Sequence, residues 1–296
     1  MEWWQAVILG LVEGITEYLP VSSTGHLIIT TELMRFEESV RGHVDDYNIV
    51  IQGGAILAVL GLYRARVWQM LKGLAGRDAV GLKLALNIMV AFVPAVVIGL
   101  MIEGWIDEHL FSTWPVLLAL ALGGIWMIWL DGWRRRKIAR AEEAGDHDAF
   151  RLGIEELSWK QALGIGLFQC VAMWPGTSRS MMTIAGGTLL GLKPKDAAEF
   201  SFLLGLPTLG GACLYKGYKN VTGAAEAGEE NMFEALGAVP IAIGLVVSLV
   251  SAMLAVKWLV AFLTKHGLSV FGWYRLALCV VLGSLVLAGV VAVGTS

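Results

Sequence analysis

The sequence predicts an all-α polytopic membrane protein. Of its 296 residues, 56% are hydrophobic and only 16% are charged, whereas soluble domains carry about 25% charged residues. Apolar stretches such as GAVPIAIGLVVSLVSAMLAV reach the roughly 20 residues that a helix needs to cross the hydrocarbon. The net charge of −3 and the lack of basic stretches interleaved with aromatics argue against nucleic-acid binding.

Six segments are apolar enough to be transmembrane spans. Two further apolar regions, residues 3–34 and 159–192, are interrupted at their middle by proline and polar residues. Each is long enough for two half-helices and a turn, so we expect two re-entrant hairpins that enter and leave on the same side. The predicted spans are residues 47–62, 84–102, 114–130, 197–215, 235–256 and 276–293.

The charge of the connections orients these spans. If six spans alternate, four connections that together hold 16 Lys and Arg share one side, and three that hold 4 share the other. Lys and Arg mark the cytoplasmic side, so both termini are expected outside and the two hairpins enter from opposite faces. The basic connections are residues 64–83, 131–158, 193–196 and 257–275.

An internal repeat predicts the domain organisation. WWQAVILGLVE from Trp3 and WKQALGIGLFQ from Trp159 share Trp, Gln, Ala, Gly and Leu at five of eleven positions. The first repeat would cover residues 1–133 and the second residues 159–296, joined by a cytoplasmic linker at 134–158. Each half then has one hairpin and three spans. Because three is odd, the second half is inverted, as in many transporters.

The first hairpin, with the motif EGITEYLPVSSTGH, carries the acidic residues. Glu13 and Glu17 are four residues apart and share a helical face. Pro20 ends the half-helix, and the free N–H groups and hydroxyls that open the next one form an anion site. His26 follows Ser23 by three residues and could reach its hydroxyl. The hydroxyl residues at this helix start are Ser22, Ser23 and Thr24.

The second hairpin, with the motif PGTSRS, carries an arginine. Arg179 would be the only basic residue deep in an apolar region, where a charge costs at least ~2.5 kcal/mol. We therefore expect it to face Glu13, Glu17 or a phosphate group, whose oxygens a guanidinium binds in bidentate fashion. Helix-opening hydroxyls surround it at Thr177, Ser178 and Ser180.

The two polar centres together favour phosphoryl cleavage. Hairpins that enter from opposite faces can bring their tips together near the midplane. Ser23 or His26 could act as nucleophile, with the histidine or a carboxylate moving protons. Glu13 and Glu17 could also hold a Mg²⁺ or Ca²⁺ ion that bridges phosphate oxygens. The alternative function is a transporter or flippase that uses the same midplane anion site, because broken helices in inverted repeats are common in transporters.

At these two motifs the sequence resembles the undecaprenyl-diphosphate phosphatase family, the bacitracin-resistance membrane phosphatases of bacteria. The likeness extends over the whole chain; the family's usual glycine after the SRS triplet is Met181 here, which removes no catalytic group. The resemblance implies hydrolysis of undecaprenyl diphosphate to undecaprenyl phosphate and inorganic phosphate, which recycles the lipid carrier of cell-wall synthesis. Under the transporter alternative, the protein would move a polyprenyl-phosphate lipid.

The resemblance also implies a divalent-cation requirement, a homodimer, and catalysis at the periplasmic side of the inner membrane. At matching positions, Glu13 and Glu17 would form the acidic motif, Ser23 would be a candidate nucleophile and His26 its proton partner. Arg179 with Ser178 would grip the phosphate. Direct attack by His26, with Ser23 only orienting it, stays open.

Overall fold

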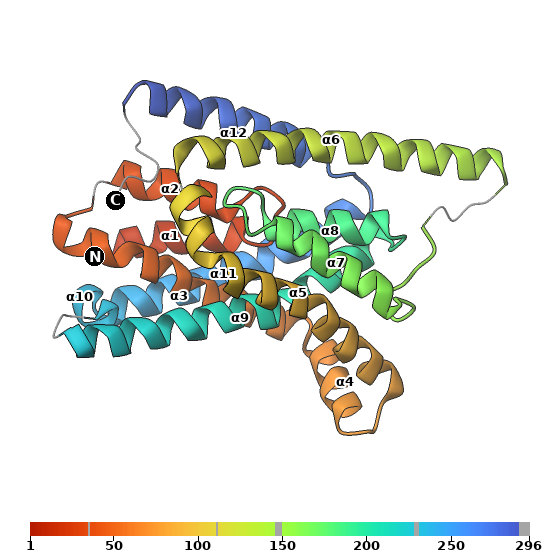
Figure 1. Ribbon diagram of the computed structural model, residues 1–296, viewed down its shortest axis with the longest axis horizontal. Coiled ribbons are helices and arrows are strands. Elements are labelled where there is room, and N and C mark those ends of the chain that lie inside the picture. Colours follow the sequence, from red (N-terminus) through yellow and green to blue (C-terminus); the bar gives the residue numbers. More distant parts are fainter. Residues whose placement is uncertain (35, 111, 146–149, 228–230, 290–296) are drawn as a thin grey trace.

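The computed structural model describes residues 1–34, 36–110, 112–145, 150–227 and 231–289. Within these ranges the chain forms twelve α-helices and no strand (Figure 1). The helices are α1 (Trp3–Thr16), α2 (Ser23–Met34), α3 (Glu38–Leu62), α4 (Arg64–Leu74), α5 (Ala79–Leu110), α6 (Thr113–Glu143), α7 (Trp159–Val171), α8 (Arg179–Leu189), α9 (Pro194–Ala227), α10 (Met232–Leu236), α11 (Ala238–Leu263) and α12 (Ser269–Leu287).

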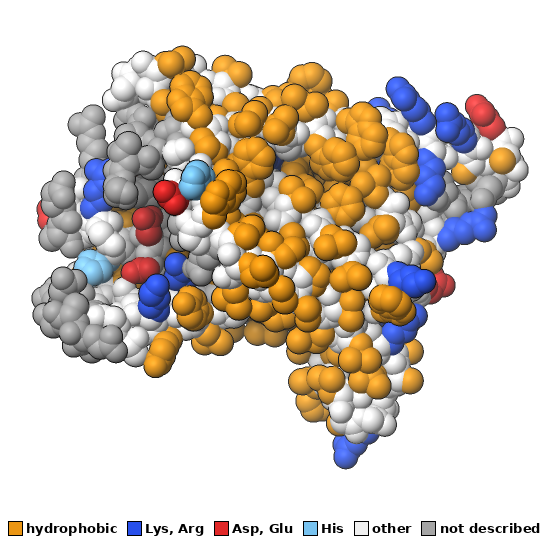
Figure 2. Space-filling view, viewed as in Figure 1, with side chains coloured by type: hydrophobic (Ala, Val, Ile, Leu, Met, Phe, Trp, Pro, Cys, Tyr) orange, Lys and Arg blue, Asp and Glu red, His pale blue; other side chains and the backbone are white. Residues whose placement is uncertain are grey.

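The helix lengths and compositions identify a multi-pass membrane protein, as predicted. Five helices, α5, α6, α9, α11 and α12, are individually long and apolar enough to cross a bilayer. The span predicted at 47–62 lies in α3, which passes this test only together with α4, and these two helices are bent by 79°. Apolar side chains cover the middle of the molecule, while Lys and Arg gather at one end, over the C-terminal end of α6 (Figure 2).

Several helices extend beyond the predicted boundaries. α6 continues to Glu143, so the predicted linker 134–158 begins with helix; residues 146–149 of that linker lie outside the described residues. α12 begins at Ser269 instead of 276, and residues 290–293 of the predicted last span also lie outside them. An apolar stretch ends at the first charged residue, but a helix can continue past it because its backbone hydrogen bonds do not depend on side-chain polarity.

Both predicted hairpins form, and they pack reciprocally. α1 lies against α11, and its repeat counterpart α7 lies against α5. The glycine matched in the repeat explains both contacts: a Cβ on Gly10 would lie 2.7 Å from the Gly244 carbonyl oxygen of α11. One on Gly166 would collide with the Ala91 carbonyl oxygen of α5. Small residues allow such close helix approach in membranes. The inverted arrangement of the two halves stays a prediction.

The glutamine matched in the repeat caps the first helix of each hairpin. The Oε1 atom of Gln5 accepts a hydrogen bond from the Glu2 backbone N–H at 2.9 Å. The Oε1 atom of Gln161 accepts from the Ser158 N–H at 3.0 Å. These N–H groups lie at helix starts, where no intrahelical partner exists.

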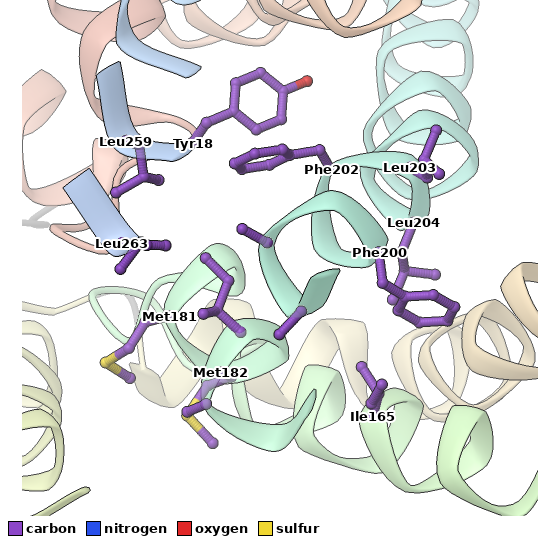
Figure 3. Packing of buried hydrophobic residues seen from close by; sticks show 14 of the residues in the cluster. Tyr18, Ile165, Met181, Met182, Phe200, Phe202, Leu203, Leu204, Leu259 and Leu263 are labelled. Atoms are coloured by element: carbon purple, nitrogen blue, oxygen red, sulfur yellow. The ribbon is translucent and has the colours of Figure 1, made fainter. Parts of the chain in front are cut away.

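The core places the turn of the first hairpin beside α9. Tyr18 lies in that turn, and its ring packs edge-on against Phe202 of α9, with centroids 5.3 Å apart (Figure 3). Met181 and Met182 of α8 belong to the same cluster. We call residues 17–23 and 172–179, where each hairpin turns into its second helix, the first and second tips. Both tips pack against one core, which fixes their relative position.

Candidate active site

Glu17 joins the two hairpins. Its Oε2 atom accepts a hydrogen bond from the Ser23 hydroxyl at 2.7 Å, and its Oε1 atom lies 3.0 Å from Nη2 of Arg179. The Glu17 and Arg179 side chains are only 6% and 11% exposed. The prediction that Arg179 faces an acidic residue is confirmed, and the acid is Glu17. One carboxylate thus contacts both a hydroxyl and a guanidinium.

The Arg179 guanidinium is fixed by further contacts. Its Nη1 atom donates to the Ser201 carbonyl oxygen at 3.0 Å, and the group lies over the Tyr18 ring, 5.6 Å from its centroid. The buried Nε atom has no hydrogen-bond partner among the described residues. This donor can take a phosphate oxygen.

In each hairpin, a serine with left-handed backbone conformation immediately precedes the second helix. Ser22 (φ 75°) precedes α2 and Ser178 (φ 77°) precedes α8. They are the only described residues other than glycine with positive φ, and they occupy the same position of the repeat. Each hydroxyl accepts from a backbone N–H three residues later, in Gly25 at 3.4 Å and Met181 at 3.3 Å. Such strain is characteristic of functional sites.

The other predicted phosphate ligands differ in availability. Ser180 is fully buried, and its hydroxyl donates to the Leu19 carbonyl oxygen at 3.0 Å, which connects the second tip to the first turn. Thr177 is buried as well. Thr24 is half-buried in the first turn of α2. The hydrogen bond from Ser180 therefore joins the two tips.

His26 does not hydrogen-bond to Ser23 in the structure, so the expectation that it could reach that hydroxyl is not met. Its Nδ1 atom lies 2.7 Å from the Ser22 carbonyl oxygen, and its Nε2 atom lies 2.7 Å from the Tyr274 hydroxyl. Glu17 takes the Ser23 hydroxyl because a carboxylate is the stronger acceptor. Tyr274, which sequence reasoning missed, is 248 residues from His26, and no local pattern signals such a contact.

Glu13 is the candidate cation ligand with free oxygens. It is fully buried one turn before Glu17, and neither carboxylate oxygen has a described partner. The described residues contain no cluster of three or more His, Cys, Asp or Glu side chains for a metal. Two carboxylates, one of them orphaned, fit a hard cation that takes its other ligands from phosphate oxygens and water.

Arg275 corrects the prediction that Arg179 is the only basic residue deep in an apolar region. It was assigned to the connection 257–275, but it is fully buried. Moving it out of that connection leaves 15 basic residues against 4, so the charge bias persists. Sequence reasoning missed it because a guanidinium can be satisfied by backbone carbonyls. It donates to the carbonyl oxygens of Ala119, Leu120, Gly176 and Thr177.

Comparison with known proteins assigns the family. The family model described as bacitracin resistance protein BacA matches residues 6–281. The undecaprenyl-diphosphatase of Pseudomonas paraeruginosa is 42% identical over 280 residues, covering 94% of this chain and 92% of that protein. Undecaprenyl-diphosphatase 2 of Rhodospirillum rubrum is 44% identical over 288 residues, covering 97% and 96%. The undecaprenyl-diphosphatase of Sorangium cellulosum is 43% identical over 287 residues, covering 97% and 86%. This chain therefore belongs to the bacitracin resistance protein BacA family.

Proposed function

We propose that the protein hydrolyses undecaprenyl diphosphate to undecaprenyl phosphate and inorganic phosphate. The observation that carries this proposal is the Glu17 carboxylate, which contacts the Ser23 hydroxyl and the Arg179 guanidinium. A potential base, a potential nucleophile and a phosphate-binding cation thus lie at one place. The relatives' name, undecaprenyl-diphosphatase, supplies the substrate.

In the proposed first step, Oγ of Ser23 attacks the terminal phosphorus. Glu17 takes the hydroxyl proton and passes it to the leaving phosphate oxygen, and the bridging P–O bond breaks with its electron pair leaving on undecaprenyl phosphate. In the second step, water attacks the phosphoserine and gives a proton to Glu17, which returns it to Ser23 Oγ as inorganic phosphate departs. We assign attack to Ser23 because both ring nitrogens of His26 are hydrogen-bonded elsewhere.

The other predicted residues bind charge in this proposal. Arg179 holds the terminal phosphate through Nε and its fork, beside the strained helix starts at Ser22 and Ser178. Glu13, with Glu17, would hold the Mg²⁺ or Ca²⁺ ion. When bound, such an ion supplies positive charge to the phosphate oxygens and stabilises the charge that develops there.

The proposal includes a membrane topology and an assembly. We place the protein in the bacterial inner membrane as an inverted repeat, with both termini and the active site facing the periplasm, and as a homodimer. The basic end of the molecule (Figure 2) supports a cytoplasmic assignment for that end. The flippase alternative is not favoured, because the relatives are named as diphosphatases.

The test is phosphate release from undecaprenyl diphosphate by the purified protein. We expect Ser23→Ala to abolish release, while Ser284→Ala, the same change at an exposed site on α12 whose hydroxyl bonds only within its helix, leaves it unchanged. A chelator should suppress release, and Mg²⁺ or Ca²⁺ should restore it. No release by the unmodified protein with any divalent cation would contradict the proposal. Lipid transport in vesicles that survives Ser23→Ala would favour a flippase.

A further inference from the structure

Two adjacent residues of α12 contact the tips of both hairpins. Tyr274 bonds to His26 behind the first tip, and Arg275 bonds to the loop of the second tip. We propose that Tyr274 and Arg275 are positioning residues, which set the geometry between Ser23 and Arg179 without touching the reacting phosphate. This inference rests on the proposed function.

The contact of Tyr274 fixes the protonation pattern of His26. A carbonyl oxygen can only accept, so the Nδ1 atom that lies 2.7 Å from the Ser22 carbonyl oxygen must carry the proton. In the neutral ring Nε2 is then the acceptor, and it receives the Tyr274 O–H at 2.7 Å. The ring is held at both ends, and through it the carbonyl of strained Ser22, next to Ser23, is held in place.

Arg275 holds the second tip against α6. Its Nη2 and Nη1 atoms donate to the Gly176 and Thr177 carbonyl oxygens at 2.7 and 3.0 Å. The same guanidinium donates to the carbonyl oxygens of Ala119 at 3.0 Å and Leu120 at 3.3 Å. The side chain is fully buried, and only arginine presents this many donors in one rigid plane. The loop it holds leads directly into Arg179.

A glycine on α6 makes this contact testable without removing the arginine. A Cβ on Gly123 would have its three closest neighbours in the Arg275 guanidinium, so Gly123→Ala should displace that flexible end while the backbone stays. Gly132→Ala is the matched control, because nothing lies within 4 Å of its Cβ position on the same helix. For Tyr274→Phe, the matched control is Tyr218→Phe at an exposed site on α9.

The experiment measures kcat and KM for undecaprenyl diphosphate, with the thermal unfolding midpoint in detergent. We expect kcat to fall roughly 3- to 10-fold in Tyr274→Phe, the loss of one hydrogen bond. In Gly123→Ala we expect a fall of about 10- to 100-fold, since misplacement by about 1 Å can cost this much. The kcat of Arg275→Lys should lie between that of the unmodified protein and that of Arg275→Met. KM should change little in Tyr274→Phe and Gly123→Ala. The midpoint should change little in Tyr274→Phe and should fall in Gly123→Ala, because the displaced Arg275 guanidinium loses buried hydrogen bonds. Both controls should retain kcat.

The outcomes separate this inference from the proposed function. An unmodified protein that releases no phosphate contradicts the proposed function. An active protein whose Tyr274→Phe and Gly123→Ala variants keep full kcat overturns the positioning roles. So does a lowered midpoint with kcat per folded molecule unchanged, because that pattern indicates a merely structural contact.

Discussion

The two hairpin tips share one backbone design and differ in chemistry. Each opens its second helix at a serine with φ near 75°, in Ser22 and Ser178. The next position is Ser23 in the first tip and Arg179 in the second. The positions of Glu13 and Glu17 in the first hairpin correspond to Gln169 and Met173 in the second. The first tip therefore carries the carboxylate and the hydroxyl, and the second carries the guanidinium.

The tips also differ in burial. In α2 only Gly25 and Leu27 are buried, whereas α8 is buried from Ser180 to Thr188. In the proposed function, the less buried first tip supplies the reacting group, and the buried second helix supplies a packed anchor for phosphate. Glu17 connects them, since it bonds to both tips.

Removing the charge that connects the tips should have the largest effect. We expect Glu17→Gln to lower the phosphate release rate about 10²- to 10⁴-fold, because a general base is lost. Glu199→Gln is the matched control, because Glu199 forms its ion pair with Arg66 of α4, at 2.8 Å, and not with Arg179. Steady-state phosphate release compares them. Retention of activity in Glu17→Gln would mean that the tips need no shared carboxylate.

Replacing the arginine of the second tip should have the next largest effect. Arg179→Lys keeps the charge but loses the planar fork, so kcat/KM should fall roughly 10- to 100-fold, the worth of one charged hydrogen bond. Arg66→Lys, at the ion pair with Glu155 and Glu199, provides the control. If Arg179→Lys matches that control, the second tip binds phosphate only as a point charge.

The third change tests the repeat partners Glu13 and Gln169. Both are buried, and the carboxylate oxygens and amide atoms have no described partner. We expect Gln169→Leu to retain activity and raise the free energy of unfolding by about 1–3 kcal/mol, because an unsatisfied buried amide is removed. Glu13→Gln should instead lose activity. Phosphate release measures the activity of both variants, and denaturant unfolding measures their stability. Equal activity losses in both variants would contradict the view that the carboxylate position matters only in the first hairpin.

The smallest effect should come from the cap of α8. Ser178→Ala loses the hydroxyl that accepts the Met181 N–H and keeps the unfavourable positive φ. We therefore expect the free energy of unfolding to fall by about 1 kcal/mol. Ser178→Gly also loses the cap, but glycine adopts positive φ freely and should be the more stable variant. Thermal unfolding in detergent measures both. If Ser178→Ala were more stable than Ser178→Gly, the positive φ at this position would not cost stability.

The sequence predicted the helical membrane fold, the two hairpins and the pairing of Arg179 with an acid. These depend on local patterns: apolar length, proline breaks and the cost of an isolated buried charge. Helix ends were less predictable, because α6 and α12 continue past charged residues. The contacts of His26 with Tyr274 and of Arg275 with the second tip were missed, since they join segments far apart in sequence.

The most direct test of the central claim is to find the atom that receives the phosphoryl group. The purified protein would be mixed with undecaprenyl diphosphate labelled at its terminal phosphate, quenched within a single turnover and digested. The account predicts acid-stable label on the peptide that contains Ser23, absent from Ser23→Ala and from Glu17→Gln. Acid-labile label on His26 that persists in Ser23→Ala would contradict it.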